Sequence, residues 1–498
     1  MLEVLNVRVA IVGAGFAGLG MAIRLKQAGI DDFVILERRD DVGGTWRDNV
    51  YPGCQCDVPS HLYSFSFAPN PAWSRTYSCQ PEIQAYLQRC AREFGVLPHV
   101  RFGSDVPSAA WDEGKRRWRV ETPAGQLCAQ VLVAAPGALS EPRIPEVPGL
   151  DSFEGRMFHS AQWDHDYELT GKRVAAVGTG ASAIQFVPRI QPEVERLHLF
   201  QRTPPWILPH TDRPVSRLER RLYARFPRLQ WLVRSGVYWA REGNVLGFVY
   251  DQRLMRMAER LARWHLRRQL PDRALRRKLR PSYRLGCKRV LLSNDYYPAL
   301  VQPNVEVVPS AIAEVRPRSV VAADGTEREI DAIIFGTGFF VTDMPSAAYI
   351  RGRGGQTLAD KWRGSPQAYM GTSIAGFPNL FMLLGPNTGL GHTSVVFMIE
   401  AQIAHVMEGL RTMQAQGLES VEVRADVQET FNAEVQQRLA GTVWNTGGCP
   451  SWYTDATGRN TTLWPDFTWR FWQRARGFDL ADYVFETARE PGPVEVTA

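Results

Sequence analysis

Gly13-Ala14-Gly15-Phe16-Ala17-Gly18 is a GxGxxG segment that stands directly after the apolar run Arg8–Val12. The apolar run predicts a short strand, and the pattern after the glycines predicts an amphipathic helix to about Ala28. Asp32–Glu37 then predicts a second strand, which ends in an acid. A strand, a glycine turn, a helix and a strand in this order form one βαβ unit.

Each glycine of this turn has a physical task if the turn binds a dinucleotide. Gly13 permits the sharp turn, Gly15 lets a pyrophosphate approach the backbone, and Gly18 lets helix and strand touch. The helix N-terminus offers free N–H groups and the positive end of the helix dipole to the phosphates. Glu37 stands where a carboxylate accepts a hydrogen bond from the ribose 2′-OH, which favours FAD or NAD. The alternative is a simple tight turn followed by a solvated Glu37.

A second βαβ unit begins with the strand predicted at Arg173–Val177. A glycine turn, a helix at Ile184–Ile190 and a strand at Arg196–Phe200 follow it. Arg202 stands where the first unit has its acid, and a guanidinium there can pair with a 2′-phosphate, which favours NADP(H) over NAD(H). A solvated surface arginine is the alternative. The residues expected to bind this second cofactor are Gly178, Gly180, Ala183 (in place of the third glycine), Arg202 and Thr203.

Length and composition predict a cytoplasmic protein of two or three domains. The chain has 498 residues, too many for one core, and its 44% hydrophobic and 22% charged residues are ordinary for a globular protein. We find no cleavable leader and no apolar stretch of about 18 residues. The seven cysteines are odd in number and scattered, which predicts no disulfide framework, no redox cysteine pair and no metal site. A chain that holds a flavin and NADPH passes electrons to a disulfide, a quinone or O2, and the lack of a cysteine pair disfavours the first of these acceptors.

The positive charge of the chain belongs to one segment. Residues 212–290 hold 22 Lys and Arg against 6 Asp and Glu, a net charge of +16 in a chain of formal net charge +6. The same segment is helical in pattern and contains Trp231, Tyr238, Trp239, Phe248 and Tyr250. A basic, aromatic helix can lie on an anionic membrane surface. It can equally form a solvated cap whose charge attracts NADPH, and we favour the cap from sequence alone.

The segment 153–164 (FEGRMFHSAQWD) lies between the two glycine turns. It resembles the FxGxxxHxxxW(P/D) motif of the type I Baeyer–Villiger monooxygenases, which are class B flavoprotein monooxygenases. Relatives that oxidise nitrogen or sulfur usually have Tyr or Phe at the last aromatic position, so Trp163 favours the ketone-oxidising branch. We expect His159 and Trp163 to act structurally on the linker between the domains. The motif residues are Phe153, Gly155, His159 and Trp163.

Nearly the whole chain resembles this family. Residues 331–339 (DAIIFGTGF) and 376–387 (GFPNLFMLLGPN) are similar to its later glycine-rich turns, although Pro136 and Gly336 depart from the common pattern. Residues 43–66 resemble the segment that embraces the flavin. The residues that the resemblance implies for FAD, beyond the first glycine turn and Glu37, are Thr45, Trp46, Asp57, Tyr63 and Val106.

The resemblance implies an NADPH- and O2-dependent enzyme that converts ketones to esters or lactones through a C4a-peroxyflavin and can also sulfoxidise. Lys288-Arg289 resembles a Lys-Arg pair in which the lysine contacts the NADP 2′-phosphate and the arginine stabilises the peroxyflavin and the adduct. Asp57 matches the acid that holds this arginine, and Trp444 matches a tryptophan that packs on the nicotinamide end of NADP. The alternatives are a basic surface for Lys288 and Arg289, a polar loop for Asp57, and core packing for Trp444.

The partners implied are a lipophilic small-molecule ketone and O2, and no nucleic acid. Two other functions stay open: a heteroatom monooxygenase that makes N-oxides or sulfoxides, and a flavoprotein that only binds or senses NADPH. Ester formation from a ketone would separate the leading function from the first of these. NADPH oxidation stimulated by substrate would separate it from the second.

The predicted fold class is α/β, with two Rossmann-like dinucleotide-binding domains, for FAD and NADP, and a helical insertion. We expect residues 1–145 to form the first part of the FAD-binding domain. Residues 146–369 would form the NADP-binding domain, with the insertion at about 210–285. Residues 370–498 would complete the FAD-binding domain, with a helix at about 394–410, and supply the C-terminal segment.

Overall fold

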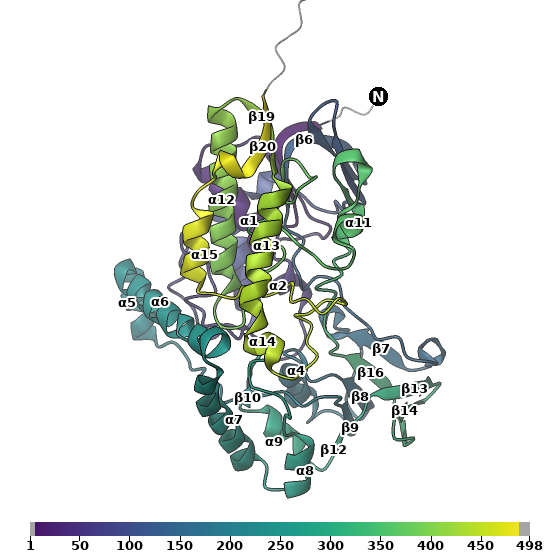
Figure 1. Cartoon of the computed structure of the whole chain (residues 1–498). Coiled ribbons are helices and arrows are strands. Elements are labelled where there is room, and N and C mark those ends of the chain that lie inside the picture. The colour runs from purple at the N-terminus through teal and green to yellow at the C-terminus, as the bar shows by residue number, and fades with distance from the viewer. Residues whose placement is uncertain (1–4, 488–498) are drawn as a thin grey trace, which may run out of the picture.

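Two sheets form the frame of the molecule, the first in the upper half of Figure 1 and the second in the lower half. The structure is a computed structural model, and it describes residues 5–487. The strands of the first sheet are, in spatial order, β17 (Ile350–Arg351), β4 (Ser108–Asp112), β5 (Arg117–Thr122), β6 (Gly125–Ala134), β1 (Leu5–Val12), β2 (Phe33–Leu36) and β3 (Val100–Arg101), and β18 (Leu380–Met382) pairs with the end of β6.

The centre of the first sheet is parallel and carries the first glycine turn. β1 lies between β2 and β6, and Val12 at its end is paired with Leu36 and Ala134. The helix α1 (Phe16–Gln27) follows the turn, as predicted. It is not amphipathic, because nine of its 12 residues are buried. The reason is that α1 packs both on the first sheet and against the long helix α12 (Val395–Ala415).

The second sheet consists of five parallel strands. Their order is β12 (Val305–Val308), β9 (Arg196–Phe200), β8 (Arg173–Val177), β16 (Ala332–Phe335) and β7 (Arg156–His159). The strands predicted at 173–177 and 196–200 are confirmed as β8 and β9, and α4 (Ala183–Ile190) lies between them. A parallel sheet with crossover helices is the architecture that the two βαβ units predicted. The predicted fold class is therefore confirmed.

The helical segment enters and leaves the second unit through two neighbouring strands. β10 (Ile207–Leu208) and β11 (Leu291–Leu292) pair in parallel, and the segment between them projects to the lower left of Figure 1. It contains four α-helices: α5 (Arg217–Arg225), α6 (Pro227–Glu242), α7 (Met255–Gln269) and α8 (Arg273–Lys278). Within residues 5–487 no helix combines the length and the apolar composition that a membrane crossing needs.

The chain returns to the first sheet earlier than the boundary at residue 370 that the sequence suggested. β17 pairs with β4, and the short helix α10 (Ser346–Tyr349) precedes it in the same core. A strand of two residues has no hydrophobic pattern, so the sequence gives no sign of this return. The chain then runs through α12, β19 (Leu418–Val423), α13 (Ala425–Ala440), α15 (Thr468–Ala475) and β20 (Tyr483–Thr487), and β20 pairs antiparallel with β19.

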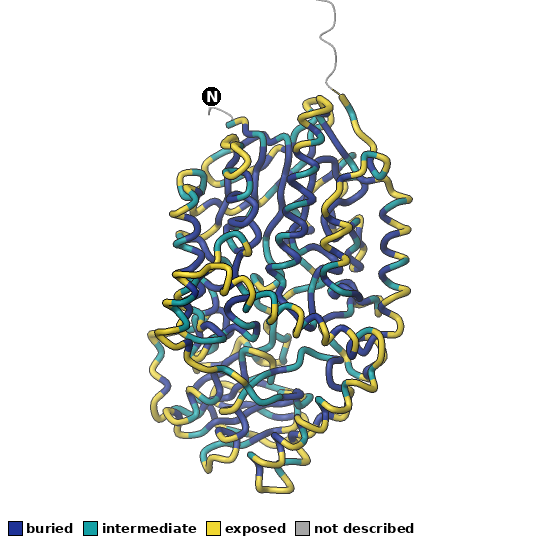
Figure 2. Tube along the Cα trace, turned by 90° about the vertical axis from the view of Figure 1, so that its left-hand side faces the viewer, coloured by how far each residue is buried: buried dark blue, intermediate teal, exposed yellow. Residues whose placement is uncertain are grey.

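One buried core joins the two halves of the molecule. The largest cluster of buried side chains includes Ile11 and Phe33 from the first unit, Val174 and Phe186 from the second, and Leu270 from the helical segment. In Figure 2 the buried trace runs through both the upper and the lower half. The two nucleotide units therefore face each other across packed side chains.

Candidate active site

The first glycine turn and Glu37 come together at the end of β1. Gly13 has φ +101°, and a Cβ on Gly18 would lie 1.8 Å from the Gly13 carbonyl oxygen, so both positions need glycine. A Cβ on Gly15 would meet only the backbone of Gly44, which leaves open space for a ligand at the start of α1. Glu37 is buried, and its carboxylate accepts the N–H of Ala14 at 2.9 Å. The solvated Glu37 of the alternative is therefore ruled out.

The flavin-embracing segment forms an aromatic wall beside this turn. α2 (Thr45–Asp48) starts at Thr45, and the indole N–H of Trp46 donates to the hydroxyl of Tyr63 at 3.1 Å. Tyr63 packs edge-on against Phe16 of α1, with the ring centroids 5.1 Å apart. Val106 lies apart from this wall, in the second buried cluster with Leu36. A backbone cradle with an aromatic wall fits a flavin dinucleotide.

The second glycine turn has the same form. Gly178 has φ +108°, and a Cβ on it would lie 2.4 Å from the carbonyl oxygen of Gly336. A Cβ on Gly180 would meet no atom within 4 Å, so the space in front of α4 is open. Ala183 is the first residue of α4 and is buried. The hydroxyl of Thr179 donates to the carbonyl of Thr203 at 3.1 Å, which ties the turn to the segment after β9.

Two cations lie beside this second turn without a carboxylate. Arg202 is exposed, and Lys288 is half-buried with its ammonium 5.4 Å from the ring centroid of Tyr283. Burial and then the positive charge of Arg202 lower the pKa of Lys288, so the two charges are close in space. Among the described residues neither side chain forms an ion pair. A pair of uncompensated cations next to a helix N-terminus fits a phosphate group.

Asp57 and Arg289 form a two-pronged ion pair between the two units. The Nε and Nη2 atoms of Arg289 donate to the two carboxylate oxygens of Asp57, each at 2.6 Å. Burial alone would raise the pKa of Asp57, but the charge and hydrogen bonds of Arg289 lower it. The charge of Asp57 in turn raises the pKa of Arg289 above its usual range. Both groups are therefore charged at any physiological pH, and the fork of the guanidinium is held in one orientation.

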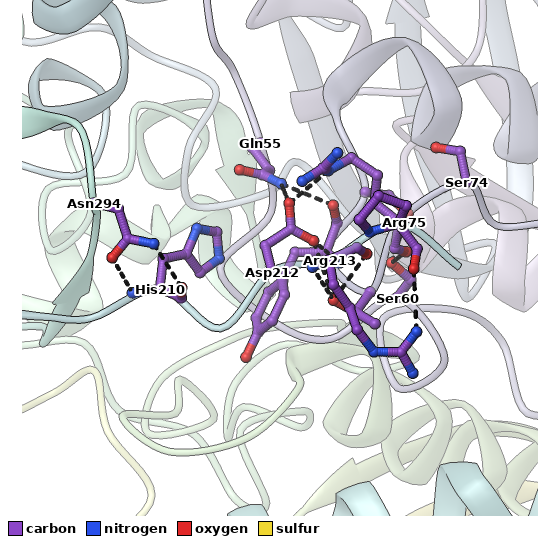
Figure 3. A network of polar contacts seen from close by, with 12 residues as sticks. Gln55, Ser60, Ser74, Arg75, His210, Asp212, Arg213 and Asn294 are labelled. Atoms are coloured by element: carbon purple, nitrogen blue, oxygen red, sulfur yellow. Dashed lines mark hydrogen bonds and ion pairs between the residues drawn. The ribbon is translucent and has the colours of Figure 1, made fainter. Parts of the chain in front are cut away.

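The start of the helical segment is hydrogen-bonded to residues 55–77, the part of the chain that also contains Asp57. Figure 3 shows Asp212 at the centre of a polar network. Its carboxylate accepts hydrogen bonds from Arg75 Nε at 2.6 Å, from Gln55 Nε2 at 3.0 Å, and from the Thr76 hydroxyl and the Tyr77 N–H at 3.1 Å. Burial would raise the pKa of Asp212, but these donors lower it. The start of the segment is thus anchored two residues away from Asp57 in sequence, at Gln55.

Comparison with known proteins agrees with this geometry. The family described as pyridine nucleotide-disulphide oxidoreductase matches residues 10–230. A protein of Streptomyces coelicolor named Baeyer-Villiger monooxygenase is 53% identical over 494 residues, which cover 99% of this chain and 95% of that protein.

The chain belongs to the Baeyer–Villiger monooxygenase family. The resemblance predicted from the linker motif is confirmed. Among solved structures, this monooxygenase is similar to a cyclohexanone monooxygenase from Rhodococcus sp. Phi1 bound to NADP+, with a TM-score of 0.86 and 28% identity over 98% of this chain and 100% of that one. It is also similar to OTEMO in complex with FAD and NADP, with a TM-score of 0.86 and 27% identity over 96% and 99% of the two chains.

The linker motif of this monooxygenase builds the edge strand of the second sheet and the turn after it. A Cβ on Gly155 would lie 2.4 Å from the carbonyl oxygen of Asp331. His159 is fully buried at the end of β7, and its Nδ1 accepts the N–H of Ala161 at 3.1 Å. Trp163 packs between Phe158 and Phe186, at centroid distances of 5.1 and 5.5 Å. Phe153 is buried in the cluster on the other face of this sheet.

Trp444 has the surroundings of a core residue. It is 2% exposed, stacks on Phe248 at a centroid distance of 6.0 Å, and lies against Gly391. These contacts agree with the packing alternative that the sequence left open for it.

The scattered cysteines predicted no disulfide framework, but two of the seven form a disulfide. Cys287 and Cys449 form a disulfide, although 162 residues separate them. The other five are free, and burial raises the pKa of Cys54 to about 12 and that of Cys90 to about 11. The bond could not be predicted from the sequence, because neither cysteine has its partner nearby in the chain. Cys287 directly precedes Lys288 and Arg289, so the bond holds the two cations to the C-terminal part of the chain.

Sequence reasoning missed Tyr453, which lies beside the Asp57–Arg289 pair. The residue is 1% exposed, and the charges of Arg289 and Asp57 act on its hydroxyl, whose pKa burial raises to about 12. That hydroxyl has no hydrogen-bond partner among the described residues. A buried O–H donor without a partner is available to a bound molecule. The sequence around Tyr453 contains no motif that would have singled this residue out.

Proposed function

We propose that this chain is an NADPH- and O2-dependent, FAD-containing monooxygenase that converts lipophilic ketones to esters or lactones. The observation that carries the proposal is the Asp57–Arg289 pair, a permanently charged guanidinium held between the two nucleotide units. When bound, NADPH would supply the electrons and FAD would pass them to O2, which supplies the oxygen atom. Family membership and the two glycine cradles support this choice over a protein that merely senses NADPH.

We assign the two cofactors to the two units. Residues 1–145 and the part from 346 onward would hold FAD, and the residues between them would hold NADPH. Arg202 and Lys288 would contact the 2′-phosphate, because a dianion is the ligand that two unpaired cations favour. The side chains and backbones we assign to FAD are Gly13, Gly15, Gly18, Glu37, Thr45, Trp46, Tyr63 and Val106, and those assigned to NADPH are Gly178, Gly180, Ala183, Arg202, Thr203 and Lys288.

Arg289 is the catalytic residue in this proposal, and Asp57 is the residue that positions it. Attack on a ketone carbonyl places negative charge on oxygen, and a preorganised cation stabilises that charge in a site from which water is excluded. Asp57 occupies Nε and Nη2 of the guanidinium, so the remaining N–H groups are the ones that can face the reacting oxygen.

The test compares Arg289→Ala with the matched control Arg277→Ala, an exposed arginine of the same basic segment. We expect Arg289→Ala to keep its FAD and to lose ester formation by about 10²–10³-fold. NADPH oxidation should continue, with release of hydrogen peroxide in place of oxygen transfer. Ester mass, flavin absorbance and peroxide are measured together. Ester formation near the wild-type rate would remove Arg289 from the mechanism, and sulfoxide without any ester would favour the heteroatom monooxygenase.

We also infer a cytoplasmic location. The demand for NADPH supports it, since cells keep this reductant inside, and five free cysteines are typical of a reducing compartment.

A further inference from the structure

The outer surface of α6 and α7 is unusually apolar for a face in contact with solvent. On α7 and the residue before it, Leu254, Met257, Leu261 and Trp264 follow one another at intervals of three and four residues and are between 45% and 77% exposed. This spacing places them on one stripe of the helix. The opposite side of α7 packs inward through buried residues that include Ala262 and Leu266. α7 is therefore seated on the protein by one face and presents a second apolar face to the outside.

α6 repeats this arrangement. Trp231, Leu232 and Trp239 are 64%, 59% and 60% exposed, and the same residues share one side of the helix. Of the 21 large hydrophobic side chains that are exposed within residues 5–487, 12 fall between Leu218 and Trp264. Figure 1 shows α5, α6 and α7 along one outer side of the molecule. Such a concentration of exposed apolar side chains in one segment marks an interaction site.

The charges beside these stripes are mostly positive, and the exposed Asp251, three residues before Leu254, is the exception. Exposed arginines flank the α7 stripe at positions 253, 256, 260 and 267. The one acid of α7, Glu259, is buried and pairs with Arg263 at 3.1 Å, and the one acid of α6, Glu242, is buried as well. The outward face of α7 therefore combines apolar side chains and arginines, and neither helix has an exposed carboxylate within its own bounds.

We propose that the α6–α7 surface docks on a lipid bilayer that contains anionic headgroups. The apolar stripes enter the boundary between headgroups and acyl chains, and the flanking arginines contact the lipid phosphates. Tryptophan is the side chain best suited to this boundary, because its ring is apolar and its N–H is polar. This is the mode of a helix that lies on the membrane.

Two other occupants of the surface fit less well. A second copy of the chain, related by a two-fold axis through this face, would bring the same arginines against each other. A solvated cap that attracts NADPH accounts for the net charge of the segment, but it gives no reason for exposed tryptophan, leucine and methionine. The structure thus reverses the preference for a cap that was drawn from the sequence, because the exposure of the stripes is visible only in the fold.

The experiment is flotation of the FAD-loaded enzyme with phosphatidylcholine vesicles, with and without phosphatidylglycerol, at low and at high salt. One variant carries Met257→Gln, Leu261→Gln and Trp264→Gln, and a second carries Arg253→Gln, Arg256→Gln and Arg260→Gln. The matched control carries Trp472→Gln, Val484→Gln and Phe485→Gln, which changes three exposed apolar residues elsewhere. Flavin content and melting temperature show that each variant is folded.

We expect the wild type and the control to float with anionic vesicles at low salt, and both test variants to bind about tenfold more weakly or worse. High salt should release the wild type, because the headgroup contacts are screened. Absence of wild-type binding to anionic vesicles overturns the proposal, as does equal loss in the control. A dimer that the stripe variant dissociates, with no vesicle binding, would assign the surface to a second copy.

Discussion

Arg202 and Arg289 show how the surroundings of one residue type decide its task. Arg289 is paired with the charged Asp57 through two hydrogen bonds, so its orientation is fixed before any ligand arrives. Arg202 is exposed and lies near Lys288, whose positive charge opposes its own. An unpaired cation beside another cation gains most from an incoming dianion. Arg202 is therefore suited to selecting a ligand.

Arg202→Ala should raise the KM for NADPH by about ten- to a hundredfold, the loss typical of a charged hydrogen bond. The KM for NADH should change little, because that cofactor lacks the 2′-phosphate. Steady-state kinetics with both cofactors measure the difference, and Arg277→Ala serves as the matched control. Equal losses with NADPH and NADH would show that Arg202 supports the fold and does not read the phosphate.

At the scale of single residues, the local sequence pattern predicts some residues of the site and not others. Glu37 and Arg202 were predicted because each follows a strand at a fixed distance from a glycine turn. The pairing of Asp57 with Arg289, 232 residues apart, came from family resemblance. Tyr453 could not be predicted, because its significance is that its hydroxyl lacks a partner, and that is a property of the packed interior.

Among the elements, the helical segment between β10 and β11 is fixed at both ends. Its start is held by the Asp212 network, and its end by the Cys287–Cys449 disulfide. The second anchor is next to Lys288 and Arg289, so it constrains the cations that we assign to the cofactor and the substrate. The sequence predicted the helices of this segment, because their periodicity is local. It did not predict the anchors, which depend on residues far away in the chain.

Replacing Cys287 and Cys449 by serine should therefore lower stability, by about 2–4 kcal/mol for a typical disulfide, and raise the KM for NADPH. Thermal melting with and without dithiothreitol measures the first effect. Reductant should lower the melting temperature of the wild type and leave the double variant unchanged. Cys79→Ser is the control, since Cys79 is an exposed free thiol. A dithiothreitol effect that persists in the double variant would contradict this role.

Buried histidines occur in both halves of the molecule, and two of them have a pKa far below the usual value. His61 and His159 are 8% and 0% exposed, and burial, joined for His61 by the charge of Arg234, lowers the pKa of each to about 4. In the unfolded chain these pKa values return to about 6.5. Below pH 6.5 the unfolded state therefore binds more protons than the folded state, so stability falls as the pH falls towards 4.

We expect acid sensitivity that begins below pH 6.5 and grows to roughly 2–3 kcal/mol for each histidine near pH 4. Melting temperatures measured across this range should fall less steeply for the double variant His61→Gln and His159→Gln than for the wild type. The control is His165→Gln, because His165 is exposed. Parallel curves for the wild type and the double variant would show that other groups cause the acid loss.

The pairing of β10 with β11 has a consequence for the history of such enzymes. Because these two strands are neighbours, the helical segment leaves the framework and returns to it at almost the same point. A segment whose two ends lie side by side can be lengthened, shortened or exchanged without altering the strand order of either sheet. Evolution can therefore change what the outer face of the enzyme touches while both glycine turns stay fixed. Transplanting the helices α5 to α8 (residues 217–278) between homologous enzymes, with Asp212, Cys287, Lys288 and Arg289 left in place, would exploit the same freedom in the laboratory.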